Sequence, residues 1–271
     1  MIMLFVKLAD APSLSTIVFT RFVVGAPLLL WLYSREKRGN LQNLLSFSGL
    51  KKHLVRSFAG IGALYAAYFS VRNLPLVNAV TLSSTSPLFL PLIYLFWSRI
   101  LVSKKRFFAA GLGFLGVCVM LRPSPGALFV SGSLLAIAAG FLRAVTVLNV
   151  RSLIRTESPL EILVYYFLTG IAFTWIPMVF DYNPVTNPLQ WLYLFATAVA
   201  AIVYQPALVY ACRHLPATKV SVISYFGVLT AGILGWLIFG EIPHLWVYIG
   251  SSLIIIGALI SLFDPTESKR V

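Results

Sequence analysis

Two stretches about half a chain apart repeat the same pattern, and this duplication limits the possible folds. Asn73-Leu74-Pro75 and His214-Leu215-Pro216 each follow an arginine and a tyrosine-containing apolar segment, at an offset of 141 residues. A hydroxyl-containing apolar segment, a short polar turn (Ser98-Arg99 or Gly240-Glu241) and a glycine-marked apolar segment come next in both. The pattern predicts two copies of one helical bundle. Such duplication in membrane helices is typical of secondary transporters, which bind substrate between the repeats.

The composition indicates an all-α polytopic membrane protein. Hydrophobic residues make up 59% of the 271 residues and charged residues 11%, which is too little polar surface for a water-soluble globule of this length. Apolar runs of about 20 residues recur, and each is long enough to cross a hydrocarbon core of about 30 Å. Helices suit this environment because they satisfy their own backbone hydrogen bonds where water is absent.

We expect nine full spans and a truncated first helix. Residues 1–8 are apolar but too short to span, so either the chain starts upstream of Met1 or it begins with a half-helix. The first interpretation is favoured, because two repeats of five helices need that helix. The expected spans are 16–33, 54–71, 76–97, 107–121, 132–150, 160–180, 191–212, 217–239 and 245–263.

The turn-rich segment Pro123-Ser124-Pro125-Gly126 divides the chain into two halves. We therefore expect a first repeat over residues 1–126, with the truncated helix, and a second repeat over residues 127–271. All connecting loops are short, so no water-soluble domain is expected.

Lysine and arginine residues predict the orientation of the spans. Sixteen of the 21 fall in or beside loops on one side of the membrane, and only Lys7, Arg72 and Arg122 fall on the other. The positive-inside rule places the first side and the C-terminus in the cytoplasm, in a multi-pass protein of the inner (plasma) membrane. The two repeats then enter the membrane in opposite senses and form an inverted repeat. The net charge of +13 reflects these loops, and no nucleic-acid partner is expected.

The chain resembles the EamA-type drug/metabolite transporters over nearly its whole length. Arg21-Phe22, the run from Asn73 through Thr85-Ser86-Pro87-Leu88 and the run from Leu215 to Glu241 carry the resemblance, with the glycines of each repeat's last helix. The family implies ten helices in two five-helix repeats and the movement of small metabolites. One departure is Ser98-Arg99, which stands where the family usually has Gly-Glu. The resemblance therefore implies the family's glutamate only in the second repeat, at Glu241.

Arg143 is the sharpest candidate for substrate binding, because it lies in the middle of a span. Ala136, Ala139 and Gly140 lie on its face of the helix and leave room for close packing or a cavity. A substrate carboxylate or phosphate would suit its planar guanidinium group. The alternative is an arginine that reaches the interface or bonds backbone carbonyls. Arg21 has the same two interpretations, since it lies near a helix end and matches the family's arginine.

Polar side chains on the duplicated hydroxyl-rich helices are further candidates for a central cavity. Alternatively, these side chains only form hydrogen bonds between helices.

Pro87 and Pro91 would kink the first of these helices and are candidates for gating. The candidates for substrate binding, besides the two arginines, are Asn78, Thr81, Thr85, Tyr204, Gln205, Ser221, Ser224 and Tyr225.

Catalytic and metal-binding patterns are absent from the sequence. The three histidines are scattered in or beside loops, and the two cysteines lie in apolar segments, so we expect no enzyme activity, no metal site and no cofactor. No acidic residue lies deep in a span, which favours exchange or uniport of an anionic or zwitterionic compound over proton antiport. Proton-driven export of amino acids or drugs is the alternative, and a membrane scaffold or intramembrane enzyme is a remote one. The expected partners are a small-molecule substrate and the lipid bilayer, and a homodimer stays open.

Overall fold

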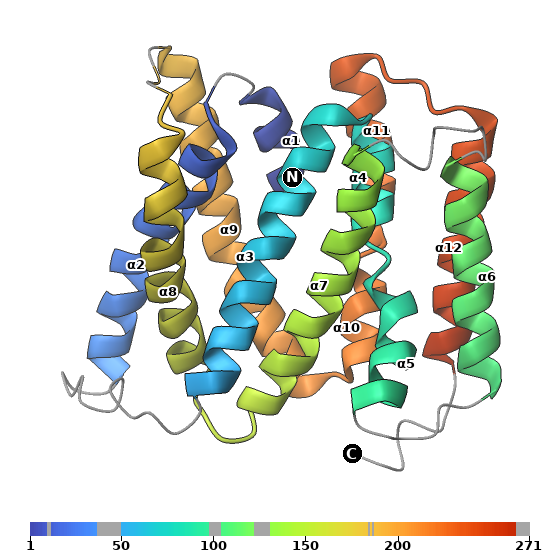
Figure 1. Cartoon of the computed structure of the whole chain (residues 1–271), viewed down its shortest axis with the longest axis horizontal. Helices are drawn as coiled ribbons and strands as arrows, with labels where there is room; N and C mark the ends of the chain where they lie inside the picture. Colours follow the sequence, from blue (N-terminus) through green and yellow to red (C-terminus); the bar gives the residue numbers. More distant parts are fainter. Residues whose placement is uncertain are drawn as a thin grey trace.

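The computed structural model describes residues 1–9, 12–36, 50–97, 104–121, 131–183, 185 and 187–263, and all regular structure in them is helical. Figure 1 shows these helices side by side in one bundle. Their bounds are α1 (Ile2–Leu8), α2 (Leu14–Glu36), α3 (Leu50–Asn73), α4 (Leu76–Ser83), α5 (Ser86–Trp97), α6 (Lys104–Leu121), α7 (Ser131–Leu153), α8 (Pro159–Phe180), α9 (Pro188–His214), α10 (Ala217–Ile223), α11 (Phe226–Phe239) and α12 (Leu245–Leu262).

Within the described residues, seven helical segments are long and apolar enough to cross a membrane, counting α4 with α5 and α10 with α11 as one segment each. The other two expected spans are α6 and α12, whose apolar parts are the shorter stretches Phe108–Val119 and Leu245–Ile260. The expected stub is α1, with 7 residues. Helices α6 and α12 both have 18 residues, close to the lengths expected for these two spans. The chain is thus a multi-pass membrane protein with the expected helical elements.

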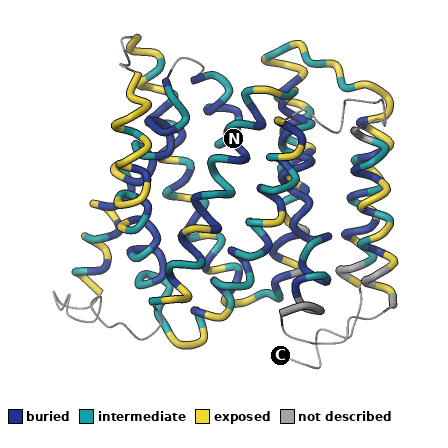
Figure 2. Tube along the Cα trace, viewed as in Figure 1, coloured by how far each residue is buried: buried dark blue, intermediate teal, exposed yellow. Residues whose placement is uncertain are grey.

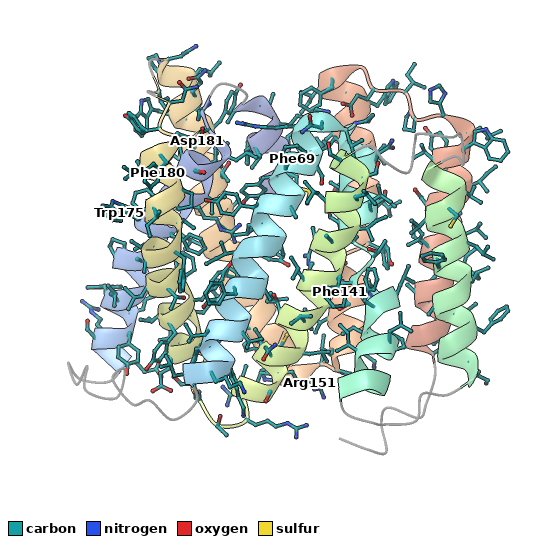
Figure 3. All side chains as sticks on the ribbon, in the orientation of Figure 1. Phe69, Phe141, Arg151, Trp175, Phe180 and Asp181 are labelled. Carbon is teal, nitrogen blue, oxygen red and sulfur yellow. The ribbon has the colours of Figure 1, made fainter. Side chains whose placement is uncertain are left out.

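The helices form an inverted repeat, with α1–α6 in one copy and α7–α12 in the other. α2 and α8 pack side by side and run in opposite directions, as do α6 and α12 (Figure 1). α4 packs against α11 and α5 against α10, so the two hydroxyl-rich helices meet along both halves of their length. Figure 3 places Arg151 at one end of the bundle and Asp181 at the other, as the expected loop positions require.

Both hydroxyl-rich helices are broken in the middle, whereas we expected continuous spans over 76–97 and 217–239. The breaks fall at Ser84-Thr85 and Ser224-Tyr225, at matching places in the two repeats. Pro87 explains the first break, because it has no N–H to bond the carbonyl of Ser83. The second has no proline. There the Ser224 hydroxyl donates to the carbonyl of Ser221 over 2.5 Å and competes with the helical backbone.

Glycines allow the closest contacts between the two repeats. A side chain at Gly116 of α6 would lie 2.6 Å from the carbonyl oxygen of Gly250 in α12, and one at Gly257 would lie 2.6 Å from the carbonyl oxygen of Ala109. Small residues of this kind let membrane helices pack backbone to backbone. Buried positions are concentrated where the helices face one another, and many outward positions are exposed (Figure 2).

Candidate functional site

Arg143 and Tyr204, which the sequence singled out separately, meet in the structure. Arg143 lies roughly 18 Å along α7 from its start, near the middle of the helix. Its Nη2 donates a hydrogen bond to the hydroxyl of Tyr204 in α9, and its guanidinium carbon lies 5.5 Å from the centre of the tyrosine ring. The side chain is half-buried. This contact joins two helices of the second repeat at mid-depth.

Gly140, one turn before Arg143, brings the broken helix of the first repeat against α7. A side chain at Gly140 would lie 2.3 Å from the hydroxyl oxygen of Thr85 and 3.2 Å from the carbonyl oxygen of Leu82. The break between α4 and α5 therefore packs directly on the helix that carries Arg143. The small-residue face predicted around Arg143 serves close packing at this position.

Arg21 of α2 is almost completely buried, with 1% of its surface exposed. Its Nη1 donates a hydrogen bond to the hydroxyl of Tyr68 in α3 over 2.9 Å. Its Nε and Nη2 have no hydrogen-bond partner among the described residues. The sequence left open whether Arg21 reaches the membrane interface, and in the structure it stays inside the bundle.

Arg56 of α3 is a second fully buried arginine that the sequence analysis did not select. Its guanidinium carbon lies 4.1 Å from the ring centre of Tyr166 in α8, and its Nε, Nη1 and Nη2 have no hydrogen-bond partner in the described part of the chain. A desolvated cation–π contact contributes about 2 kcal/mol, whereas burying an ion costs several kcal/mol. The aromatic contact alone therefore does not compensate for the buried charge.

From the sequence, Arg56 resembles the loop cations, because it lies in the first turns of α3, next to Lys51 and Lys52. Gly60, one turn later on the same face, is the signal that could have revealed it. A side chain there would lie 2.9 Å from the Tyr166 ring, so the glycine makes room for the ring that Arg56 contacts.

Two tyrosines lie among the three arginines. Tyr166 is near both Arg21 and Arg56, and Tyr204 is near Arg21 and accepts the hydrogen bond from Arg143. The contributing helices are α2, α3, α7, α8 and α9, so both repeats take part. We call this set the arginine–tyrosine cluster; its members are Arg21, Arg56, Tyr68, Arg143, Tyr166 and Tyr204.

Other candidate residues are placed differently. The hydroxyls of Thr81 and Thr85 donate to carbonyls of their own helix, at Val77 and Leu82. Gln205 is buried beside Tyr204, with no partner for its Oε1 in the described residues. Asn78 and Ser224 are half-buried, and Ser221 is buried.

Tyr225 lies outside the arginine–tyrosine cluster. It is buried in a separate apolar group with Val228 and Ile254, beside a groove of about 360 Å³ that Ile223, Phe226 and Leu259 also line. The polar candidates of the two broken helices therefore do not converge on a single point.

Acidic residues in the described part of the chain lie at helix ends or in turns. Glu157 pairs with His53, and Glu161 caps the start of α8 in a capping box with Ser158. Burial, together with the carboxylate of Glu161, raises the pKa of Glu157. Glu36 and Asp181 are exposed at the ends of α2 and α8. None of these carboxylates bonds an arginine of the cluster.

Glu241, the glutamate of the Gly-Glu turn, links the two repeats. One carboxylate oxygen pairs with Lys7 of α1, and the other accepts a hydrogen bond from the backbone N–H of Leu76 at the start of α4 over 2.6 Å. Gly240 ends α11 with φ +64°, a left-handed conformation that favours glycine. The glutamate therefore caps a helix of the other repeat.

Unlike the glutamate, a basic side chain that bonds the Leu-Pro turn is described in both repeats. Lys7 donates to the carbonyl of Leu74 over 3.0 Å, and Arg151 donates to the carbonyl of Leu215 over 2.8 Å. The duplicated Leu-Pro turns thus bind a cation from the helix that begins each repeat. Ser98-Arg99, the counterpart of Gly240-Glu241, lies outside the described residues.

Comparison with known proteins identifies relatives over most of the chain. A riboflavin transporter of Vibrio cholerae is 28% identical over 220 residues, which cover 80% of this chain and 74% of that protein. The pseudopaline exporter CntI of Pseudomonas aeruginosa is 25% identical over 244 residues, which cover 90% of this chain and 84% of that protein. A second riboflavin transporter, of Brucella anthropi, is 26% identical over 259 residues, or 94% of this chain and 89% of that protein.

The fold is shared with a solved crystal structure, which has a TM-score of 0.67 and 18% identity over 96% of this chain and 94% of the other. The family model of the EamA-like transporter family matches twice, over residues 2–122 and 130–263. These matches agree with the inverted repeat of helices and with the motifs that carried the resemblance. The chain belongs to the EamA-like transporter family and is a membrane transporter of small metabolites.

Proposed function

We propose that this chain carries an anionic or zwitterionic metabolite across the cytoplasmic membrane by alternating access, with the C-terminus in the cytoplasm. The substrate site lies at the Arg143–Tyr204 contact of the arginine–tyrosine cluster, and these two residues contact the substrate. The observation that carries this proposal is the cluster itself: three arginines within the bundle, joined by tyrosines, with no carboxylate bonded to them in the described residues. An anionic substrate group supplies the missing negative charge.

The chemistry of the cluster fits small carboxylates and flat ligands. A guanidinium group binds a carboxylate through two parallel hydrogen bonds, and a tyrosine ring offers both an apolar face and a hydroxyl. Among the relatives are a riboflavin transporter and a pseudopaline exporter, so riboflavin and pseudopaline belong in the first substrate screen. The two repeats rock against each other around the site, and the broken helices α4–α5 and α10–α11 bend at their interruptions.

The test is counterflow in proteoliposomes with a mixed metabolite pool that includes amino acids, riboflavin and pseudopaline. We compare the unchanged protein with Arg143→Gln and with Arg213→Gln, a control that removes the same charge from an exposed position in the last turn of α9. Saturable transport of an anionic or zwitterionic compound, lost in Arg143→Gln and kept in Arg213→Gln, is the expected result. Equal affinity for that compound in all three proteins would contradict the role of Arg143.

The driving force is tested in the same vesicles. We expect trans-stimulation by internal substrate, because no carboxylate of the described residues lies inside the bundle to carry a proton. The second candidate function is proton-driven export of amino acids or drugs. Dependence of the rate on an imposed pH gradient, without trans-stimulation, would favour that alternative.

A further inference from the structure

The fully buried pair Arg56–Tyr166 lies on α3 and α8, apart from the Arg143–Tyr204 contact on α7 and α9. Arg56 lies about 9 Å along α3 from its start, at the end of the bundle where α2 finishes. Arg21 lies about 10 Å along α2 from the opposite end of the bundle. Tyr166 contacts Arg56 and lies near Arg21. The two buried cations thus approach one tyrosine from opposite ends of the bundle.

The contact with Tyr166 leaves the hydrogen-bonding groups of Arg56 unused. The guanidinium carbon lies 4.1 Å from the centre of the aromatic ring, which engages the π face of the tyrosine. The N–H groups of Arg56 point outward in the guanidinium plane, and Nε, Nη1 and Nη2 have no acceptor among the described residues. Those edges are the groups that bind a planar oxyanion in a bidentate manner.

No carboxylate of the described residues is hydrogen-bonded to Arg56. The titratable groups near it include Tyr166, Cys212, Arg21 and His53. Tyr166 and Cys212 are ordinarily neutral at pH 7, Arg21 is a second cation, and the carboxylate of Glu157 is already paired with His53. Arg56 is 1% exposed, so bulk water does not screen its charge. A buried cation with free donors and a neighbouring cation attracts a small anion strongly.

We propose that Arg56 and Tyr166 form a binding site for a carboxylate group, separate from the Arg143–Tyr204 contact. The carboxylate binds the free edge of the Arg56 guanidinium, Tyr166 covers the face of that group, and Arg21 adds positive potential. The carboxylate belongs either to a free small acid or to a second acidic group of the transported compound. Binding at this site does not require that transport be observed, so it is tested on its own.

The experiment measures the midpoint of thermal unfolding of the full chain in lipid nanodiscs. Sodium acetate is the probe, with acetamide as the neutral analogue of the same shape and sodium chloride at equal ionic strength. We expect acetate at tenfold its dissociation constant to raise the midpoint by about 3 °C, because a ligand stabilises the state that binds it. Acetamide and chloride are expected to give no comparable shift.

Three variants locate the effect. Arg56→Gln is expected to lose the acetate shift, and Arg56→Lys, which keeps the charge without the planar fork, is expected to reduce it several-fold. Arg213→Gln, at an exposed position, is expected to keep it. If Arg56→Gln does not fold, Arg56→Lys carries the test. An acetate shift that is matched by chloride or acetamide, or that is unchanged in both Arg56 variants, would overturn the proposal.

Succinate distinguishes the two sources of the carboxylate. A compound with two carboxylates that engages both buried arginines is expected to give a larger shift than acetate, and Arg21→Gln should reduce that shift to the acetate value. This result assigns the site to a substrate with two acidic groups. Equal shifts for succinate and acetate, both lost in Arg56→Gln, assign the site to a free small acid. In either case the result is independent of counterflow.

Discussion

Phe22 of α2 and Phe167 of α8 interlock across the boundary between the repeats. Their ring centres lie 5.5 Å apart at an interplanar angle of 81°, and each ring packs on a glycine of the opposite helix. Phe22 covers Gly170, and Phe167 covers Gly25, so the two contacts are equivalent under the inverted symmetry. A pair of duplicated segments thus forms one self-complementary interface, as in a two-fold dimer.

Gly170→Ala is expected to disrupt this interface. The added carbon would lie 2.4 Å from Cδ1 of Phe22, a ring buried on all sides, so the two helices must separate. We expect the free energy of unfolding to fall by about 1–3 kcal/mol, which is typical of overpacking in a well-packed core. The check is the midpoint of thermal unfolding in detergent or nanodiscs.

Gly111→Ala is the matched control, because a side chain at that position of α6 meets nothing within 4 Å. It is expected to leave the stability unchanged or to raise it by up to about 1 kcal/mol, since alanine favours helix more than glycine. Equal midpoints for Gly170→Ala and Gly111→Ala would contradict the interlocking of the two rings.

Glu241→Gln tests the contact between the Gly-Glu turn and the start of α4. The amide keeps one acceptor for the N–H of Leu76 but leaves the half-buried Lys7 without its ion-pair partner. We expect a loss of about 1–3 kcal/mol in the free energy of unfolding, because the Lys7 ammonium group stays partly desolvated without the carboxylate that compensates for its burial. Thermal unfolding checks this value.

Glu36 is exposed at the end of α2, so Glu36→Gln serves as the control. It is expected to change the free energy of unfolding by less than about 0.5 kcal/mol. Lys7→Met alone removes the other partner of the same ion pair. Because the two residues are in contact, the double variant Lys7→Met/Glu241→Gln should lose less stability than the sum of the losses in the two single variants. Additive losses would show that the ion pair contributes nothing.

Pro87→Ala tests whether the break between α4 and α5 is needed for movement. Alanine supplies an N–H that can bond the carbonyl of Ser83, so the two short helices can join into one. We expect the turnover rate in counterflow to fall about tenfold while stability stays equal or rises. Pro27→Ala, at an exposed proline inside α2, is the control and should not slow transport. Unchanged turnover in Pro87→Ala would exclude a role of this break in gating.

Periodicity and composition predicted most of the fold, because a membrane helix must be apolar over its length and loops must carry the charges. The inverted repeat and its helical elements follow from these constraints alone. The breaks were missed at Thr85 and Tyr225. At the first, Pro87 predicted a kink in a continuous helix, but not where the hydrogen bonds end. At the second, a serine hydroxyl competes with the backbone, and a mid-span serine also occurs in unbroken helices.

Site residues were harder to predict because burial and partners depend on neighbouring helices. Arg143 and Tyr204 stood out as polar groups in apolar spans, yet nothing in their spacing showed that they meet. Arg56 resembled the loop cations beside it, and only its packing under Tyr166 distinguishes it. Tyr225 looked equivalent to the other tyrosines but faces α12 rather than the arginines. The sequence shows which face of a helix a residue occupies. It does not show which neighbouring helix packs against that face.

Tyr204→Phe is expected to weaken substrate binding without unfolding the protein. The variant keeps the ring that lies 5.5 Å from the Arg143 guanidinium and removes the hydroxyl that accepts its hydrogen bond. Arg143 then loses its orientation toward the substrate, so we expect KM for counterflow to rise about tenfold, the equivalent of roughly 1.4 kcal/mol, with a smaller change in the turnover rate. Tyr210→Phe, at an exposed tyrosine in the same helix, is the control and should keep the original KM. A KM that is equal in both variants would place the substrate away from the Arg143–Tyr204 contact, even if transport itself is confirmed.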